Sequence, residues 1–156
     1  MKANELRIGN FVTINNPEHW KSLKNIPLVV TAIKDTCAEF EFSIGLSPMK
    51  ATPLNWQTYA QFNCYIEPIL LTEEWILKFG FKKTDCKCEC EEDNLEYYEK
   101  NKLTICNWGG KGFVMSNAFS HGLRINLIYV HQLQNLYFVL IGEELYFNEF
   151  EKLKER

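Results

Sequence analysis

Three cysteines at alternate positions, Cys86, Cys88 and Cys90, carry the side chains of this sequence that are best suited to bind a metal ion. In an extended strand, alternate side chains share one face but lie about 7 Å apart. A zinc ion instead needs each sulfur at about 2.3 Å from one centre, and no Cys-x-x-Cys pair is present. The spacing therefore predicts no metal or cofactor. A folded-back loop that adds a fourth ligand, and a redox-sensitive thiol cluster, remain as alternatives.

A glycine-rich segment from Trp108 to Phe113 surrounds one lysine, Lys111. A phosphate-binding P-loop needs four residues between its first glycine and the Gly-Lys pair, followed by serine or threonine. Here Lys111 is followed by Gly112, so the segment predicts a glycine-rich β-turn. The alternative is a flexible loop in which Lys111 meets an anionic ligand while an aromatic ring stacks on a base.

Two histidines, one arginine and one tyrosine complete the candidate ligand-binding residues. His121 and Arg124 lie at the start of a predicted strand, and His131 lies in the first turn of a predicted helix, whose dipole favours a neutral imidazole. Tyr137 lies further along that helix. With the glycine-rich segment, these cations and rings would suit a nucleotide; the alternative for each is a structural role. Neither histidine can be paired with a nucleophile from the sequence, so we predict no catalytic residues.

The first 70 residues predict a small antiparallel β-barrel or sheet, with an SH3-like barrel as the candidate architecture. Four strands are expected, over residues 11–14, 27–33, 37–44 and 64–69. Pro68 places the last of them at a sheet edge, because proline cannot donate a hydrogen bond to a neighbouring strand. Residues 46–62 between them predict irregular structure.

Residues 71–156 predict an α+β region, either a second domain or part of one continuous domain. Strands are expected over residues 95–98, 103–108, 113–116 and 122–129. Residues 82–94 are charged and predict a loop. The fold class expected for the whole chain is therefore α+β.

Two short helices are expected to pack this second half. The first begins at Thr72 and ends at Gly80, with Phe81 placed to close a Schellman-type cap. The second lies between Tyr129 and Gly142, where apolar residues recur at helical spacing. Its polar residues are expected to face outward; they are His131, Gln132, Gln134 and Asn135.

Composition limits the classes of function. The chain of 156 residues is 46% hydrophobic and 14% aromatic, with a formal net charge of −3. This balance is unlike that of a general nucleic-acid binder, which needs a basic surface. No stretch has the ~18–20 apolar residues of a membrane span, and the first ten residues do not resemble a signal peptide. The sequence therefore predicts no membrane partner, a cytoplasmic location in a host cell, and reduced cysteines.

Three segments together carry a resemblance to a known family. They read MKANELRIGNFV from Met1 to Val12, IEPILLTEEWILKFGF from Ile66 to Phe81, and YVHQLQNLYF from Tyr129 to Phe138, followed by GEEL. They cover a little over a quarter of the chain. This pattern resembles a widespread group of uncharacterised small proteins of gut anaerobes, their phages and integrated elements. The resemblance implies a phage or mobile-element accessory role and implies no catalytic residue. The cysteine-rich segment and the residues beyond Leu145 are outside the pattern.

Four functions are compatible with these observations. The first is a phage or mobile-element accessory protein that acts by binding a host or phage protein rather than by catalysis. The others are an anti-defence protein that sequesters a nucleotide signal, an enzyme that acts on nucleotides, and a virion-associated or assembly protein. Self-association into a homo-oligomer is compatible with each of them.

Overall fold

The chain is described by a computed structural model over residues 3–15, 26–35, 42–48, 59–62, 66–84, 95–108, 112–116 and 125–146. In these ranges it forms two antiparallel five-stranded sheets and two α-helices, which confirms the α+β class. The chain divides into two compact units. Unit 1 comprises Met1–Ile69 with Tyr129–Asn135, and unit 2 comprises Leu70–Ile128 with Leu136–Arg156. Unit 1 therefore takes a short segment from the second half of the chain.

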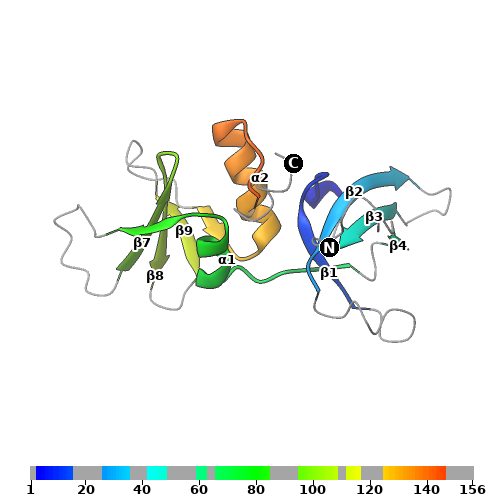
Figure 1. The fold of residues 1–156 in the computed structure, drawn as a ribbon, viewed down its shortest axis with the longest axis horizontal. Coiled ribbons are helices and arrows are strands. Elements are labelled where there is room, and N and C mark those ends of the chain that lie inside the picture. Colours follow the sequence, from blue (N-terminus) through cyan, green and yellow to red (C-terminus); the bar gives the residue numbers. More distant parts are fainter. Residues whose placement is uncertain are drawn as a thin grey trace, which may run out of the picture. The chain divides into compact units, whose positions relative to one another are not determined.

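The sheet of unit 1 has the strand order β4-β3-β2-β1-β5. Its strands are β1 (Phe11–Ile14), β2 (Leu28–Asp35), β3 (Phe42–Pro48), β4 (Tyr59–Phe62) and β5 (Ile66–Pro68). Strands β1 to β4 follow one another across the sheet (Figure 1), and β5 returns to pair with β1. In the described residues β4 and β5 are both edges, so the strands form an open sheet rather than a closed barrel.

The core of unit 1 follows from the alternation of apolar residues along β1, β2 and β5. Val12 pairs with Leu28, and Ile14 pairs with Ile66, so these side chains share one face of the sheet. With Leu6 and Val30 they form a buried cluster. The predicted edge strand is confirmed as β5, which ends at Pro68 on the outer side of the sheet.

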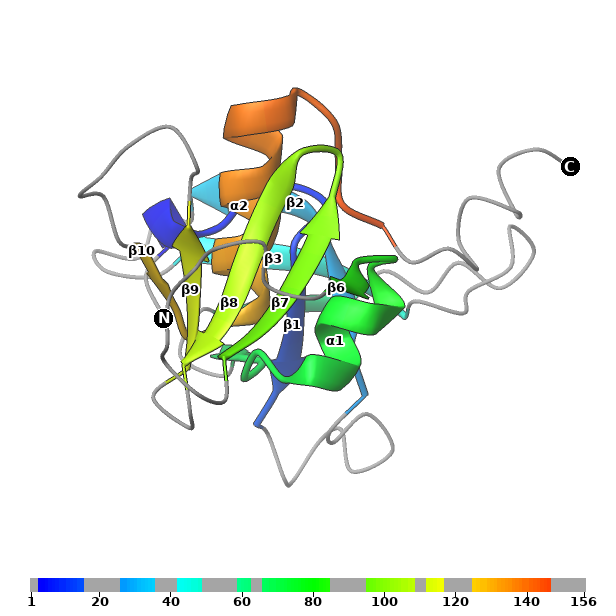
Figure 2. The same cartoon turned by 90° about the vertical axis from the view of Figure 1, so that its left-hand side faces the viewer.

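The sheet of unit 2 has the strand order β10-β9-β8-β7-β6 (Figure 2). Its strands are β6 (Lys82–Thr84), β7 (Leu95–Lys100), β8 (Leu103–Trp108), β9 (Phe113–Ser116) and β10 (Ile125–Leu127). Strands β7, β8 and β9 lie where the sequence predicts strands. The sequence missed β6, which has only three residues, and predicted a longer strand around β10. The two lysines of β6 also protect this edge from pairing with another chain.

The β7–β8 hairpin is closed by a two-residue turn, Asn101-Lys102, in which both residues have positive φ angles of 48° and 67°. Two positive φ angles suit the right-handed twist of the flanking strands. Asparagine tolerates this conformation and here also donates a hydrogen bond from Nδ2 to the Tyr137 hydroxyl at 2.7 Å. Lysine has no such advantage, so the backbone at Lys102 is strained.

Replacing this lysine with glycine, Lys102→Gly, is expected to raise the free energy of unfolding by about 0.5–1 kcal/mol. The left-handed conformation costs a residue with a Cβ about 1–2 kcal/mol, and the greater freedom of glycine in the unfolded chain offsets part of that gain. Chemical denaturation measures the change. Lys102→Ala is the matched control and should give no gain; equal stabilisation by both variants would contradict strain as the cause.

Helix α1 (Glu73–Lys78) confirms the predicted helix and its predicted C-terminal cap. Phe81 N–H donates to the Ile76 carbonyl at 3.3 Å, and Gly80 N–H donates to the Leu77 carbonyl at 2.9 Å. These are the two bonds of a Schellman motif, and Gly80 supplies the positive φ of 80° that it requires. Trp75, Ile76 and Phe79 are buried, which gives this two-turn helix the support that its length alone cannot provide.

Helix α2 (Val130–Ile141) also begins and ends close to the predicted positions. At its start Tyr129 N–H donates to Gln132 Oε1 at 3.1 Å, which is one half of a capping box. At its end Gly142 has a φ of 80°. The sequence missed the short 3-10 helix η1 (Ala3–Glu5) and strand β4, which lies in the stretch predicted to be irregular.

Candidate functional site

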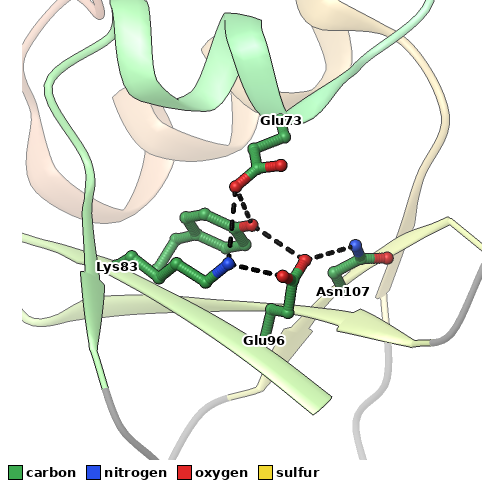
Figure 3. Close-up of polar contacts among 5 residues, drawn as sticks. Glu73, Lys83, Glu96 and Asn107 are labelled. Carbon is green, nitrogen blue, oxygen red and sulfur yellow. Dashed lines mark hydrogen bonds and ion pairs between the residues drawn. The ribbon is translucent and has the colours of Figure 1, made fainter. Parts of the chain in front are cut away.

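A group of polar side chains in unit 2 surrounds the hydroxyl of Tyr98; Glu73, Lys83, Glu96 and Asn107 belong to it (Figure 3). Tyr98 lies on β7 and its ring is fully buried, with 0% of its surface exposed. Its hydroxyl is 2.7 Å from Glu73 Oε1, at the start of α1, and 3.1 Å from Glu96 Oε2, two residues earlier on β7. The hydroxyl therefore lies where a helix meets the sheet.

Two further side chains complete this group, which we call the Tyr98 network. Lys83 on β6 donates to Glu96 and lies 3.7 Å from Glu73 Oε1, with its ammonium 5.9 Å from the centre of the Tyr98 ring. Asn107 on β8 donates from Nδ2 to Glu96 at 3.0 Å. The members thus come from α1, β6, β7 and β8, as Figure 3 shows for the labelled side chains.

Hydrogen bonds and burial in the Tyr98 network shift the pKa values of Glu96, Lys83 and Tyr98. The hydrogen bond from Lys83 lowers the pKa of the Glu96 carboxyl, and the same bond raises the pKa of the Lys83 ammonium. Burial, followed by the hydrogen bond to Glu73, raises the pKa of the Tyr98 hydroxyl. The Lys83–Glu96 ion pair therefore stays charged at neutral pH and the phenol stays protonated.

This protonation pattern determines what the Tyr98 network can do chemically. A phenol held in its protonated form donates a hydrogen bond and does not act as a base or nucleophile. It has one proton, and the shorter distance to Glu73 places the proton on that contact. The arrangement therefore fastens the N-terminal turn of α1 to the sheet. One part of the Tyr98 network could be predicted from the sequence. Glu96 and Tyr98 are two residues apart on a predicted strand, so their side chains lie on the same face.

A second group of polar side chains lies in unit 1 and joins the N-terminal turn to the start of α2. The turn is formed by residues 7–10: Asn10 N–H donates to the Arg7 carbonyl at 3.1 Å, and Arg7 N–H donates to Asn10 Oδ1 at 2.7 Å. Gly9 adopts a φ of 94°, which a residue with a Cβ rarely tolerates. Its N–H donates to the Val30 carbonyl, which binds the turn to β2.

Two amide side chains from α2 bind this turn. Gln134 Oε1 accepts a hydrogen bond from Phe11 N–H at 2.8 Å, and Gln134 Nε2 donates to the Gly9 carbonyl at 3.1 Å. Asn135 Nδ2 donates to the Glu5 carbonyl at 2.9 Å, and Asn135 Oδ1 accepts from Asn10 Nδ2 at 2.9 Å. We call these contacts the amide junction. The two bonds of Gln134 satisfy the buried N–H of Phe11 and the buried carbonyl of Gly9, which would otherwise lack these partners.

The prediction that the polar residues of α2 face outward is therefore wrong for two of them. Gln134 is 0% exposed and His131 is 3% exposed. Helical periodicity assigns polar residues to the solvent face. A buried glutamine satisfies its hydrogen bonds through the backbone of a segment more than 120 residues away, and periodicity within the helix contains no information about that segment.

His131 lies in the same part of unit 1, in the first turn of α2. Its ring stacks on Tyr129, with ring centres 5.7 Å apart and planes at 11°. Its Nδ1 is buried and has no hydrogen-bond partner among the described residues. Burial lowers the pKa of the imidazole, while the nearby charge of Glu5 raises it; the net pKa is below the ordinary value. The folded protein therefore favours the neutral ring.

Acid is expected to destabilise the protein through His131. Its pKa is lowered in the folded state, so the unfolded chain binds the proton more tightly. The stabilising contribution is present above the unfolded pKa of about 6.5 and is lost as the pH falls through the lower, folded pKa. One proton limits the slope to about 1.4 kcal/mol per pH unit. Denaturation of the wild type and of His131→Phe, which retains an aromatic ring, measures the difference from pH 8 to pH 5.

Groups that titrate in both proteins contribute equally to the two unfolding free energies, so they cancel in the difference. As the pH falls, His131→Phe should become more stable relative to the wild type. A difference that stays constant across this range would show that the imidazole titrates alike in the folded and unfolded states.

The structure describes only some of the ligand-binding residues predicted from the sequence. Lys111, His121 and Arg124 lie outside the described residues, as do Cys86, Cys88 and Cys90. Trp108 is the last residue of β8, and its side chain is outside the described part. The roles predicted for these residues stay predictions.

Among the described candidates, Tyr137 lies in the core of unit 2. It is buried, its hydroxyl accepts a hydrogen bond from Asn101, and Phe81 meets its ring edge-on at 6.3 Å. The ammonium of Lys100 lies 5.7 Å from the ring centre and donates to the Phe79 carbonyl at 2.6 Å. Tyr137 thus joins α2 to the hairpin turn and to the end of α1.

Strand β9 lies between β8 and β10 and pairs with both of them. Its first residue, Phe113, pairs with Asn107 near the end of β8 and with Leu127 on β10. Its last residue, Ser116, pairs with Thr104 near the start of β8. Tyr137 binds the β7–β8 turn, near the Ser116 end.

The described residues contain no group of three or more histidine, cysteine, aspartate or glutamate side chains placed to hold a metal ion. Within the same ranges, neither helix is long and apolar enough to cross a membrane.

The segments that carry the family resemblance meet one another in unit 1. The first contributes the N-terminal turn and β1, and the last contributes Gln134 and Asn135 to the amide junction. The middle segment contributes β5, which pairs with β1, and the Ile69 carbonyl, which accepts a hydrogen bond from Val130 N–H at 2.9 Å. Backbone contacts of the middle segment and the amide side chains of the last segment thus serve the architecture of unit 1.

Comparison of the chain with protein-family models, with curated proteins and with solved structures returned no match.

Proposed function

We propose that this chain is a phage or mobile-element accessory protein that acts by binding a protein partner rather than by catalysis. The three segments that resemble proteins of phages and integrated elements support the setting. The observation that carries the binding role is the exposure of apolar side chains on α2, where Val139 is 75% exposed and Leu140 is 46% exposed.

These two side chains lie in the part of α2 that belongs to unit 2, one turn after the half-buried Leu136. Burying a fully exposed valine or leucine side chain gains roughly 1.5–3 kcal/mol. Val139 and Leu140 would gain in proportion to their exposed fractions of 75% and 46%, so the pair would supply part of a binding energy. Glu143 is exposed one turn further on. The partner that fits this surface has an apolar contact patch with a basic side chain at its rim, facing Glu143.

The test is capture of the partner from host cells through a photo-crosslinking residue at position 139, followed by binding measurements on the identified protein. Val139→Asp is expected to weaken binding at least tenfold, because each 1.4 kcal/mol lost is a factor of ten in Kd. Leu77→Asp is the matched control. Leu77 on α1 is 46% exposed, as Leu140 is, and lies in the same unit. Thermal denaturation must show that both variants fold.

Equal binding by the wild type and both variants would overturn the role of the α2 surface. A nucleotide ligand is tested separately by native mass spectrometry with a panel of cyclic and ADP-ribose-type nucleotides. A mass shift at micromolar ligand would favour the sequestration of a nucleotide signal and would contradict a purely protein-binding role.

We also propose the SH3-like arrangement for unit 1. Support comes from the succession β1 to β4 across the sheet and from the return of β5 to the outer side of β1. An experimental structure of unit 1 in which these five strands form a flat sheet, without the curl of an SH3-like fold, would contradict it.

A further inference from the structure

We draw no further inference here: the strongest candidate, the buried imidazole of His131 in the first turn of α2, rests on its lowered pKa alone, because no described residue binds its Nδ1 and nothing beside it indicates a ligand.

Discussion

Replacing Gln134 with alanine is expected to lower the free energy of unfolding by about 2–4 kcal/mol. The side chain is fully buried and makes two hydrogen bonds to backbone groups, with Phe11 N–H as donor and the Gly9 carbonyl as acceptor. Removing it takes away both of these buried hydrogen bonds, and losing a buried partner costs about 1–3 kcal/mol for each group. Urea denaturation, read from the shift in midpoint at constant m-value, measures the loss.

The matched control is Gln132→Ala on the same helix. Gln132 is only half-buried, and its Oε1 accepts a hydrogen bond from the N–H of Tyr129, three residues earlier. Its removal should cost roughly 1 kcal/mol or less, the usual effect of losing one cap. If both variants lost the same amount, the amide junction would contribute nothing beyond local helix propensity.

Gln134→Glu gives a second, independent test of the amide junction. A glutamate keeps the acceptor for Phe11 N–H, but its ionised form has no proton to donate to the Gly9 carbonyl. The variant should therefore be much less stable than the wild type at pH 7. Its relative stability should recover as the pH falls and the carboxyl gains a donor proton. Destabilisation that does not depend on pH would indicate a steric cause.

Structural features that depend on residues close together in the sequence could be predicted. The C-terminal cap of α1 requires only a glycine at one position and an apolar residue after it, and Gly80 and Phe81 supply both. The β7–β8 hairpin follows from two apolar runs separated by polar residues, and the edge position of β5 follows from Pro68. Each of these signals lies within about ten residues of the structure that it specifies.

Structure that depends on distant segments could not be predicted in this way. β6 is a strand because Lys82, Lys83 and Thr84 pair with β7, and nothing in three polar residues indicates that partner. The inward position of Gln134 depends on a turn at the other end of the chain. The same limit applies to the Tyr98 network, since the alternation on β7 places Glu96 beside Tyr98 but gives no sign of Glu73 on a helix.

Replacing Tyr98 with alanine is expected to destabilise the protein by about 3–5 kcal/mol, the usual cost of removing a buried aromatic ring. The ring is fully buried and meets Phe113 edge-on, with centres 6.2 Å apart. Tyr98→Phe keeps the ring and removes only the hydroxyl. It should cost about 1–2 kcal/mol, because Glu73 and Glu96 are partly exposed and retain water and Lys83 as partners.

The two variants together separate the packing of the ring from the fastening of α1. In Tyr98→Phe, hydrogen exchange should accelerate at the amides of Trp75 and Ile76, which bond to the Thr72 carbonyl in the first turn of α1. Amides in β8, which is linked to the Tyr98 hydroxyl through Asn107 and Glu96 rather than directly, should change no more than the global loss of stability requires. Uniform acceleration across unit 2 would show that the hydroxyl stabilises the unit as a whole and does not hold α1 in particular.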